Sequence, residues 1–227
     1  MTLGTKIILQ CAASLLIAAV VLFGTAGTTK YWQGWVYLAI VFIPMFIFSA
    51  YYYKHDPAVV ERRMRRREKE EPQKVVMKIA NVMAIVILMV PGFDYRFGWS
   101  KRLFGQVPPI WLEVVGIVLS LTSYLTTIYV IDVNRFAGRT VQVDQGQTVV
   151  STGPYGVVRH PMYSAAVVMT LFTPLALGSY IAVPFCLLFI PLMVVRLLNE
   201  EEILRRDLTG YPEYCQRTRY RLIPHIW

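Results

Sequence analysis

Residues 161–195 form a run of 35 residues that contains no charged side chain. A helix needs about 20 apolar residues to cross roughly 30 Å of hydrocarbon, so this run is too long for one crossing and about right for two short ones. Gly178 and Ser179 stand near its middle and provide a natural turn. We therefore expect the run to fold as a tight helical hairpin within a membrane.

Four further apolar segments precede this run, and each is close to the length of one membrane crossing. They cover residues 7–23, 34–53, 75–91 and 109–131. Over the whole chain 56% of the residues are hydrophobic and 16% are charged, whereas about a quarter are charged in a typical soluble domain. The sequence therefore predicts an all-α, polytopic integral membrane protein with about six embedded helices, of which the last two form the hairpin.

The first apolar segment has a second interpretation. Lys6 stands before it and residues 23–26 after it, so it could be a cleaved signal peptide. Because five further embedded segments follow, an uncleaved first helix is the more natural prediction.

The basic residues are distributed unevenly between the two predicted sides of the membrane. The connections on one side, together with Lys6 and the C-terminal segment, contain 19 Lys and Arg residues, and the other side contains 4. Cytoplasmic connections of membrane proteins carry such an excess. We therefore expect a multi-pass protein with both termini in the cytoplasm, and we interpret the net charge of +9 mainly as a topology signal.

The most basic connection, residues 54–78, contains nine basic and five acidic side chains. Pro57 to Glu71 favours a short juxtamembrane helix that lies against anionic lipid headgroups. Nucleic-acid binding would need interleaved aromatic residues, which are absent here, so we expect no nucleic-acid partner.

Metal binding and disulfide formation are not indicated. The three cysteines fall in two predicted helices and in the C-terminal segment, where none has a plausible disulfide partner. No Cys/His spacing is typical of a zinc site, so we expect no metal.

The candidate functional residues are concentrated in the last third of the chain. Residues 159–163 read RHPMY, and Pro161 is well placed as the first residue of a helix. The free N–H groups of a helix N-terminus attract anions, and Arg159 and His160 stand directly before this one. Because the hairpin goes out and returns, this motif and the polar segment after residue 195 must meet at the same interface.

That polar segment starts with the letters RLLNEEE. Arg196 and Glu200 are four residues apart and share a helix face, so they can pair or present opposite charges to one ligand. Glu201 lies about 100° further around the helix. Arg196 follows an unbroken apolar run, and an ionisable group at the hydrocarbon boundary usually has a function. We expect these residues, with Tyr211 further on, to surround one cytoplasmic mouth.

These motifs resemble the isoprenylcysteine carboxyl methyltransferase family, which is related to the membrane phospholipid N-methyltransferases. The resemblance rests on RHPMY, on R-x-x-x-E-E-x-x-L at residues 196–204, and on G-Y-x-x-Y followed by a terminal R-L-I-P. It covers about residues 132–227, and the first four helices resemble the family only in number, length and hydrophobicity. The family usually has a glycine soon after the tyrosine of RHPxY, where this chain has Ser-Ala-Ala at 164–166.

The resemblance implies two regions. Residues 1–131 would contain four N-terminal transmembrane helices and the basic cytoplasmic loop 54–78. Residues 132–227 would form the cofactor-binding and catalytic region. The implied activity is methyl transfer from S-adenosylmethionine to a lipid-borne, amphiphilic or prenylated acceptor from the bilayer. No Gly-rich strand–turn–helix fingerprint for a dinucleotide occurs, so a soluble nucleotide fold is not expected.

The chemistry of S-adenosylmethionine then suggests contacts for individual residues. Its carboxylate suits Arg159, His160 and the helix N-terminus at Pro161. Its amino group and ribose hydroxyls suit Glu200 or Glu201. Its sulfonium cation suits an aromatic face, and the candidates are Tyr155, Tyr163 and Tyr211.

Two residues are candidates for catalysis, which consists mainly of aligning the nucleophile, the methyl group and the sulfur. A carboxylate acceptor would need a cation to hold it, and Arg196 is our candidate. An amine or thiol acceptor would need a base, for which Glu200 is the better candidate.

Other interpretations stay open. The Arg-His pair could simply anchor a helix end, the three glutamates could form a solvated turn, and the tyrosines could form an aromatic belt. In place of a carboxylate methyltransferase, the chain could be a phospholipid amine N-methyltransferase or an NADPH-dependent membrane reductase similar to sterol reductases, which have a comparable C-terminal segment. It could also be a non-catalytic lipid-binding scaffold. The RHPMY motif favours the methyltransferase.

Overall fold

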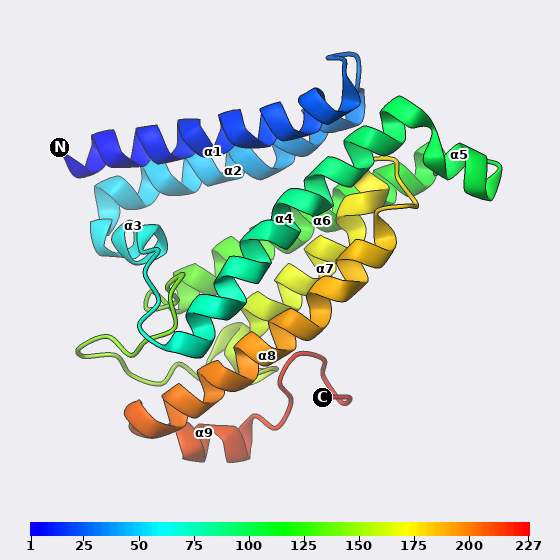
Figure 1. Ribbon diagram of the computed structural model, residues 1–227. Helices are drawn as coiled ribbons and strands as arrows, with labels where there is room; N and C mark the ends of the chain where they lie inside the picture. Colours follow the sequence, from blue (N-terminus) through cyan, green and yellow to red (C-terminus); the bar gives the residue numbers. More distant parts are fainter.

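The computed structural model describes all 227 residues and is built from helices (Figure 1). The helices that are long and apolar enough to cross a membrane are α1 (Leu3–Ala26), α2 (Trp32–His55), α4 (Glu71–Phe97), α6 (Ile110–Val133) and α8 (Val183–Asp207). A sixth apolar helix, α7 (Pro161–Ala176), is shorter, with 16 residues. Short helices complete the fold, namely α3 (Pro57–Met64), α5 (Trp99–Phe104), α9 (Tyr211–Arg217) and a 3-10 turn at Gly153–Gly156. The prediction of an all-α, polytopic membrane protein is confirmed.

The six apolar helices, namely the five long ones and α7, are arranged as two rows of three. In one row α4 packs between α1 and α8, and in the other α6 packs between α2 and α7. The pairs α1–α2 and α7–α8 join the two rows at the flanks (Figure 1). The two middle helices, α4 and α6, have little direct contact with each other. The space that separates them at one end of the bundle is the cavity described below.

The uncharged run folds as the expected hairpin of α7 and α8. Gly178, in the link between them, has a φ of +68°, a conformation that glycine adopts without Cβ strain. The link is fixed by side chains from other helices. The Tyr31 hydroxyl donates to the carbonyl of Leu177 at 2.5 Å, and the Ser179 hydroxyl donates to the carboxylate of Asp94 at 2.5 Å.

Helices α6 and α7 approach each other closely at Gly116 of α6. A Cβ atom at this position would lie only 2.5 Å from the backbone nitrogen of Ala176, so no larger residue fits without displacement. At the other end of α7, Ser164 donates its hydroxyl to the carbonyl of Leu222 at 2.6 Å. The serine therefore links α7 to the C-terminal segment.

The juxtamembrane helix is shorter than the sequence pattern indicated. It ends at Met64, and the residues between α3 and α4 are not helical, so the prediction of one helix up to Glu71 is wrong beyond Met64. The physical reason is Glu68, whose buried carboxylate turns inward and accepts the N–H of Val141 at 2.9 Å. The loop therefore packs into the protein instead of lying only against headgroups.

Both chain termini lie at the same end of the bundle. Gly4 near the start of α1 packs against the ring of Tyr53 near the end of α2. At the C-terminal side, the N–H of Arg159 donates to the carbonyl of Tyr220 at 2.8 Å, which fixes the last residues beside the start of α7. The helices α3 and α9 lie at this end as well (Figure 1).

Candidate functional site

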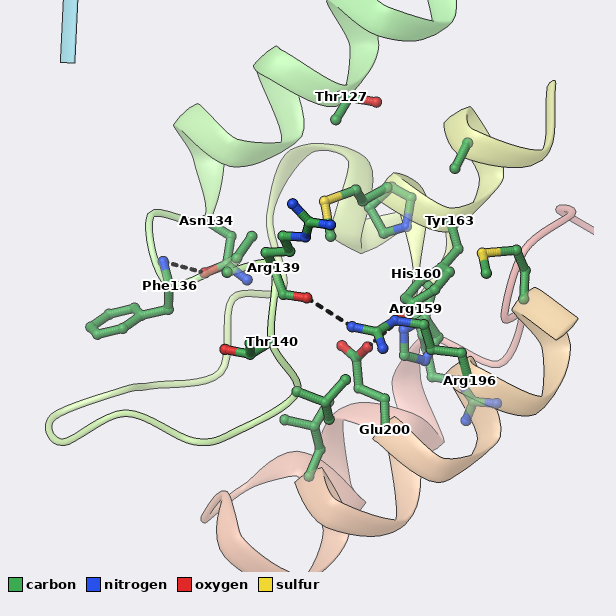
Figure 2. Close-up of a pocket in the computed structure, with 18 of the residues that line it drawn as sticks. Thr127, Asn134, Phe136, Arg139, Thr140, Arg159, His160, Tyr163, Arg196 and Glu200 are labelled. Atoms are coloured by element: carbon green, nitrogen blue, oxygen red, sulfur yellow. Dashed lines mark hydrogen bonds between the residues drawn. The ribbon is translucent and has the colours of Figure 1, made fainter. Parts of the chain in front are cut away.

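A cavity of about 440 Å³ lies between α4, α6, α7 and α8 and extends to α9 and the segment 134–150. Protein sites for drug-sized ligands have volumes of roughly 300–1,000 Å³. Apolar residues such as Ala84, Met169 and Phe189 line its inner part. Figure 2 shows the polar part, where side chains from α7, α8 and the segment before α7 surround one space.

Eight of the nine predicted site residues line this cavity, as the hairpin topology requires. They are Tyr155, Arg159, His160, Pro161, Tyr163, Arg196, Glu200 and Tyr211. The ninth, Glu201, does not line the cavity. Its position therefore differs from the one expected for a residue that contacts the ligand directly. The binding and catalytic roles of all nine stay predictions.

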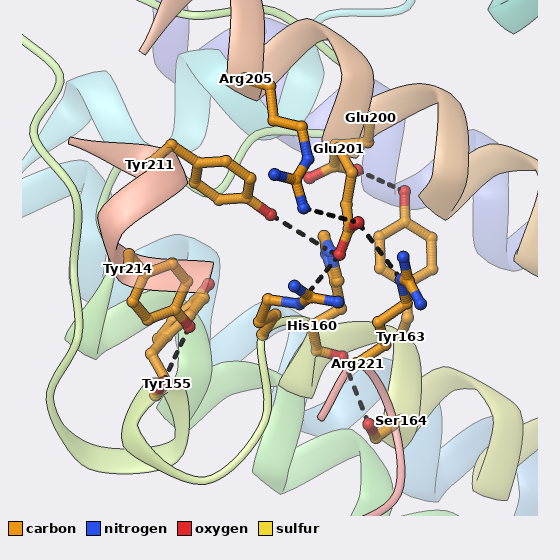
Figure 3. A network of polar contacts seen from close by, with 11 residues as sticks. Tyr155, His160, Tyr163, Ser164, Glu200, Glu201, Arg205, Tyr211, Tyr214 and Arg221 are labelled. Carbon is orange, nitrogen blue, oxygen red and sulfur yellow. Dashed lines mark hydrogen bonds and ion pairs between the residues drawn. The ribbon is translucent and has the colours of Figure 1, made fainter. Parts of the chain in front are cut away.

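Glu201 is instead the centre of a buried ionic cluster (Figure 3). Its Oε1 lies 3.0 Å from Nε of Arg159 and 3.2 Å from Nε2 of His160, and its Oε2 lies 3.2 Å from Nε of Arg221. Arg205 adds a longer contact of 3.8 Å. One carboxylate therefore holds the RHPMY motif, α8 and the C-terminal segment together. Its charge is offset by more than one cation.

Arg159 retains hydrogen-bonding capacity within this cluster. Its Nε is close enough to Glu201 for an ion pair, but the geometry is not that of a hydrogen bond, so this buried N–H has no acceptor in the protein. Buried donors without partners are rare and costly. At the start of α7, the N–H groups of Tyr163 and Ser164 already donate to the carbonyl of His160. An anion at this helix N-terminus would therefore depend mainly on side chains.

Glu200 presents its carboxylate to the cavity. Its Oε2 accepts the hydroxyl proton of Tyr163 at 2.6 Å, so α7 and α8 meet there through a charge-assisted hydrogen bond. Glu200 is the only acidic residue among those that line the cavity, whereas four arginines line it. It is therefore the natural contact for an amino group or a hydroxyl of a ligand.

Arg196 does not pair with Glu200, although the two share a face of α8. Its NH2 lies 2.9 Å from Oε1 of Glu68 and donates to the carbonyl of Arg139 at 2.7 Å, while its NH1 donates to Oε1 of Gln73 at 2.9 Å. Gln73 in turn donates to the backbone carbonyl of Arg196 at 3.1 Å. The guanidinium is thus firmly oriented, and part of its donor capacity is used before any ligand arrives.

Tyrosines form the aromatic part of the mouth. The Tyr211 hydroxyl lies 3.5 Å from Nε2 of His160, and the Tyr214 hydroxyl donates to the carbonyl of Tyr155 at 2.8 Å (Figure 3). Burial raises the pKa of Tyr155 to about 12, so its phenol is neutral at physiological pH. Neutral aromatic rings of this kind offer faces that attract cations.

Comparison with known proteins shows that part of this region is similar to a known family. Residues 111–208 match the family described as Phospholipid methyltransferase. The matched part runs from the first turn of α6 to the end of α8 and contains both RHPMY and the 196–204 motif. It supports the broad relationship that the motifs indicated.

A curated relative gives a second similarity. Over 91 residues the chain is 32% identical to the Delta(14)-sterol reductase TM7SF2 of Mus musculus. The aligned part is 39% of this chain but only 22% of that protein, so the chain spans about a fifth of the length of the relative that it matches.

Three residues of the site were not predicted as site residues from the sequence, and all three precede residue 111, where the family match begins. Glu68 and Gln73 orient Arg196, and Arg63 lines the cavity. Glu68 stands in a run of mixed charges, where nothing distinguishes it from a solvated residue. The only available signal was Gln73, which is a polar residue at the start of a long apolar helix and is fully buried in the structure.

Proposed function

We propose that this protein is an integral membrane, S-adenosylmethionine-dependent methyltransferase that acts on a lipid-borne acceptor. Our first choice of acceptor is an isoprenylcysteine-type carboxylate. One observation carries the proposal: polar side chains from both C-terminal motifs meet at one end of a largely apolar cavity between membrane helices. Such a cavity suits a polar methyl donor from the aqueous side and an apolar acceptor from the bilayer.

The residues present fit this methyl donor. Its carboxylate would use the buried Nε of Arg159 that has no acceptor in the protein, next to His160. Its amino group or ribose would use Glu200, and its sulfonium would use the faces of Tyr155 and Tyr163. When bound, the donor supplies an activated methyl group. A positioning role for Glu201, through Arg159 and His160, is consistent with its place outside the cavity.

The chain's own contribution to the reaction is alignment, exclusion of water and control of charge. A carboxylate acceptor is ionised at neutral pH and needs no base, so a fixed cation such as Arg196 would hold it in line. An amine acceptor must lose a proton, for which the Glu200 carboxylate is the available base. The two acceptor classes therefore differ in which residue they require.

The decisive test begins with binding. Calorimetry on the purified protein in lipid nanodiscs should show binding of S-adenosylmethionine, and Glu200→Gln and His160→Ala should weaken it. Absence of binding by the unmodified protein would contradict the proposal. Lipid extracts incubated with an isotopically labelled methyl donor, followed by mass spectrometry, then identify the acceptor. Unchanged binding and phenotype in both variants would favour a non-catalytic scaffold.

A membrane reductase is the second candidate, and the similarity to the sterol reductase favours it. The two candidates differ in cofactor, and a bound cofactor raises the melting temperature by mass action. Under our proposal S-adenosylmethionine raises the melting temperature in detergent and NADPH does not. The reverse result would assign the cavity to a reductase.

A further inference from the structure

A second cavity, of about 330 Å³, adjoins the first and lies between α1, α2, α3 and α6. Nine of the 15 residues that line it are hydrophobic, among them Ile7, Phe48 and Ile131. Four residues line both cavities and form the partition between them. They are Arg63, Tyr124, Thr127 and Arg139.

Arg63 brings a positive charge into this partition without a counter-ion. Its NH1 donates to the carbonyl of Gly138 at 3.2 Å and contacts the sulfur of Met162 at 3.5 Å, but no carboxylate lies within ion-pair distance. Its neighbours differ, since Arg62 and Arg65 both pair with Asp144. Burial lowers the pKa of Arg63, although a guanidinium still stays charged at neutral pH.

Arg139 adds a second charge of the same kind. Its backbone is engaged, because its carbonyl accepts from Arg196 and its N–H donates to the carbonyl of Arg62. Its guanidinium forms no ion pair and no hydrogen bond within the protein. Burial and the nearby cations Arg66 and Arg196 lower the pKa of Arg139. Two partly buried like charges without a counter-ion are costly unless an anion joins them.

We propose that Arg63 and Arg139 bind the anionic head group of an amphiphilic acceptor whose apolar chain occupies the second cavity. This inference rests on the proposed function and adds Arg63 and Arg139 to Arg196 as cations for the acceptor. Arg139 adjoins Arg196, because its carbonyl accepts from the Arg196 guanidinium at 2.7 Å. This role is distinct from the donor-binding role proposed for Arg159 and His160. Carboxylate and phosphate oxygens share the required chemistry, because a guanidinium donates to either with two parallel N–H groups. The partition places such a head group beside the first cavity, where the methyl donor is proposed to bind.

The test measures binding of matched amphiphiles to the whole protein in neutral maltoside micelles, with the S-adenosylmethionine affinity as a separate measurement. One probe pair is S-farnesyl-N-acetylcysteine, an anionic carboxylate, and its neutral methyl ester. The other is lysophosphatidic acid, which contains an anionic phosphate, and monoacylglycerol with the same acyl chain, which lacks it. The variants are Arg63→Gln, Arg139→Gln and the charge-preserving Arg63→Lys. Arg67→Gln is the matched control, because Arg67 is exposed and lines neither cavity.

A hydrogen bond to a charged group contributes about 1.5–3 kcal/mol, which corresponds to about ten- to a hundred-fold in affinity. We therefore expect Arg63→Gln and Arg139→Gln each to lower the affinity for an anionic probe by about ten- to a hundred-fold. In these variants the affinities for the neutral probe and for the methyl donor should change by less than about twofold. In the Arg67→Gln control the affinity for every probe should change by less than about twofold. Arg63→Lys should restore part of the affinity. The pair that responds identifies the head group as a carboxylate or a phosphate.

Three results would overturn the inference. The first is an equal loss of affinity for anionic and neutral probes, and the second is no binding of any probe to the unmodified protein. The third is that the variants lose binding of the methyl donor but keep binding of the amphiphile. The last result would assign Arg63 to the donor. Charge-dependent binding of an amphiphile without any binding of S-adenosylmethionine would contradict the proposed function and leave this site in place.

Discussion

Glu68 lies with Oε1 2.9 Å from NH2 of Arg196, and both side chains are buried. The two residues are separated by 128 positions in the chain, so the loop between α3 and α4 closes over the start of the polar part of α8. The pair sets the direction in which Arg196 faces the cavity. It also makes the basic loop part of the candidate site.

Removal of the Glu68 charge should destabilise the protein strongly. In Glu68→Gln a buried guanidinium loses its only carboxylate within ion-pair distance, and such losses cost about 3–5 kcal/mol. Thermal unfolding in detergent should show a clear drop in melting temperature. The double variant Glu68→Gln/Arg196→Met should recover part of this loss, because it no longer buries an unpaired charge.

The matched control is Glu70→Gln. Glu70 pairs with Arg206 at 3.0 Å on the surface, and exposed pairs of this kind contribute about 0–1 kcal/mol. Equal melting temperatures for the two single variants would contradict a structural role for the Glu68–Arg196 pair.

The Tyr163 hydroxyl should matter more for ligand binding than for folding. Tyr163→Phe removes one hydrogen bond to Glu200, which costs the fold about 1 kcal/mol, but it also frees the Glu200 carboxylate to move. We expect weaker binding of S-adenosylmethionine, measured by calorimetry. Tyr52→Phe removes a hydrogen bond from a tyrosine to a carboxylate, that of Asp132, and neither residue lines the first cavity, so this variant should leave the affinity unchanged. If both variants bind alike, Tyr163 has no special role.

The close contact between α6 and α7 should not tolerate a methyl group. Gly116→Ala would place a Cβ 2.5 Å from a backbone atom of Ala176, and overpacking of this kind costs about 1–3 kcal/mol. Gly24→Ala in α1 is the control, because no side chain beyond its two chain neighbours and no other helix lies within 4 Å of its added Cβ. It should be neutral or slightly stabilising, since alanine favours helices by about 0.5–1 kcal/mol over glycine. Melting temperatures of the two variants provide the comparison.

Acid should loosen the segment between α6 and α7. Burial by itself raises the pKa of Asp144, but hydrogen bonds from Arg65, Gln142 and Arg62 outweigh it, so the pKa lies below its ordinary value of 3.8. Folding therefore favours the charged form. The resulting stabilisation is complete above the ordinary value and is lost as the pH falls through the lower, folded-state value.

Hydrogen exchange of residues 134–150 measures this effect. Protection should decline as the pH falls below about 4, after correction for the intrinsic pH dependence of exchange. Asp144→Asn should show reduced protection already at neutral pH and little further change in acid. A parallel acid response in the variant would show that another group is responsible.

Both termini should face the cytoplasm. They lie at the same end of the bundle as the strongly basic loop before α4, and basic connections remain on the cytoplasmic side. Reporter fusions at either terminus should therefore give a cytoplasmic signal, and a fusion in the α1–α2 connection should give the opposite one. A reversed pattern would contradict the orientation.

The membrane helices were predictable because apolar length alone determines them. The predicted segment 75–91 is nevertheless shorter than α4, which begins at Glu71 and ends at Phe97. Hydropathy detects only the part within hydrocarbon, whereas backbone hydrogen bonding continues the helix into the polar regions on either side. The same effect extends α8 to Asp207, far beyond the uncharged run.

The candidate site was predictable only where local pattern and topology agreed. The hairpin forces His160 and Glu200 to the same end of the bundle, and a single sequence is enough to see this. The contact between Glu68 and Arg196 depends on how the first half of the chain packs on the second, which no local pattern encodes. Helical spacing predicted that Glu201 points in a different direction from Glu200. It did not predict that cations surround Glu201.

Helices α4 and α6 have little direct contact with each other, so one face of α4 borders the cavity. Changes in the shape of the cavity and changes in its ionic cluster can therefore arise separately during evolution. The side chains of Met77 and Ala84 on α4 border the cavity, whereas the ionic cluster around Glu201 is built by α7, α8 and the C-terminal segment. Substitutions on α4 can therefore alter the volume offered to a substrate without disturbing that cluster. Under the proposed function, we expect related chains to diversify first along this wall, so that new substrates are acquired while the reaction is retained.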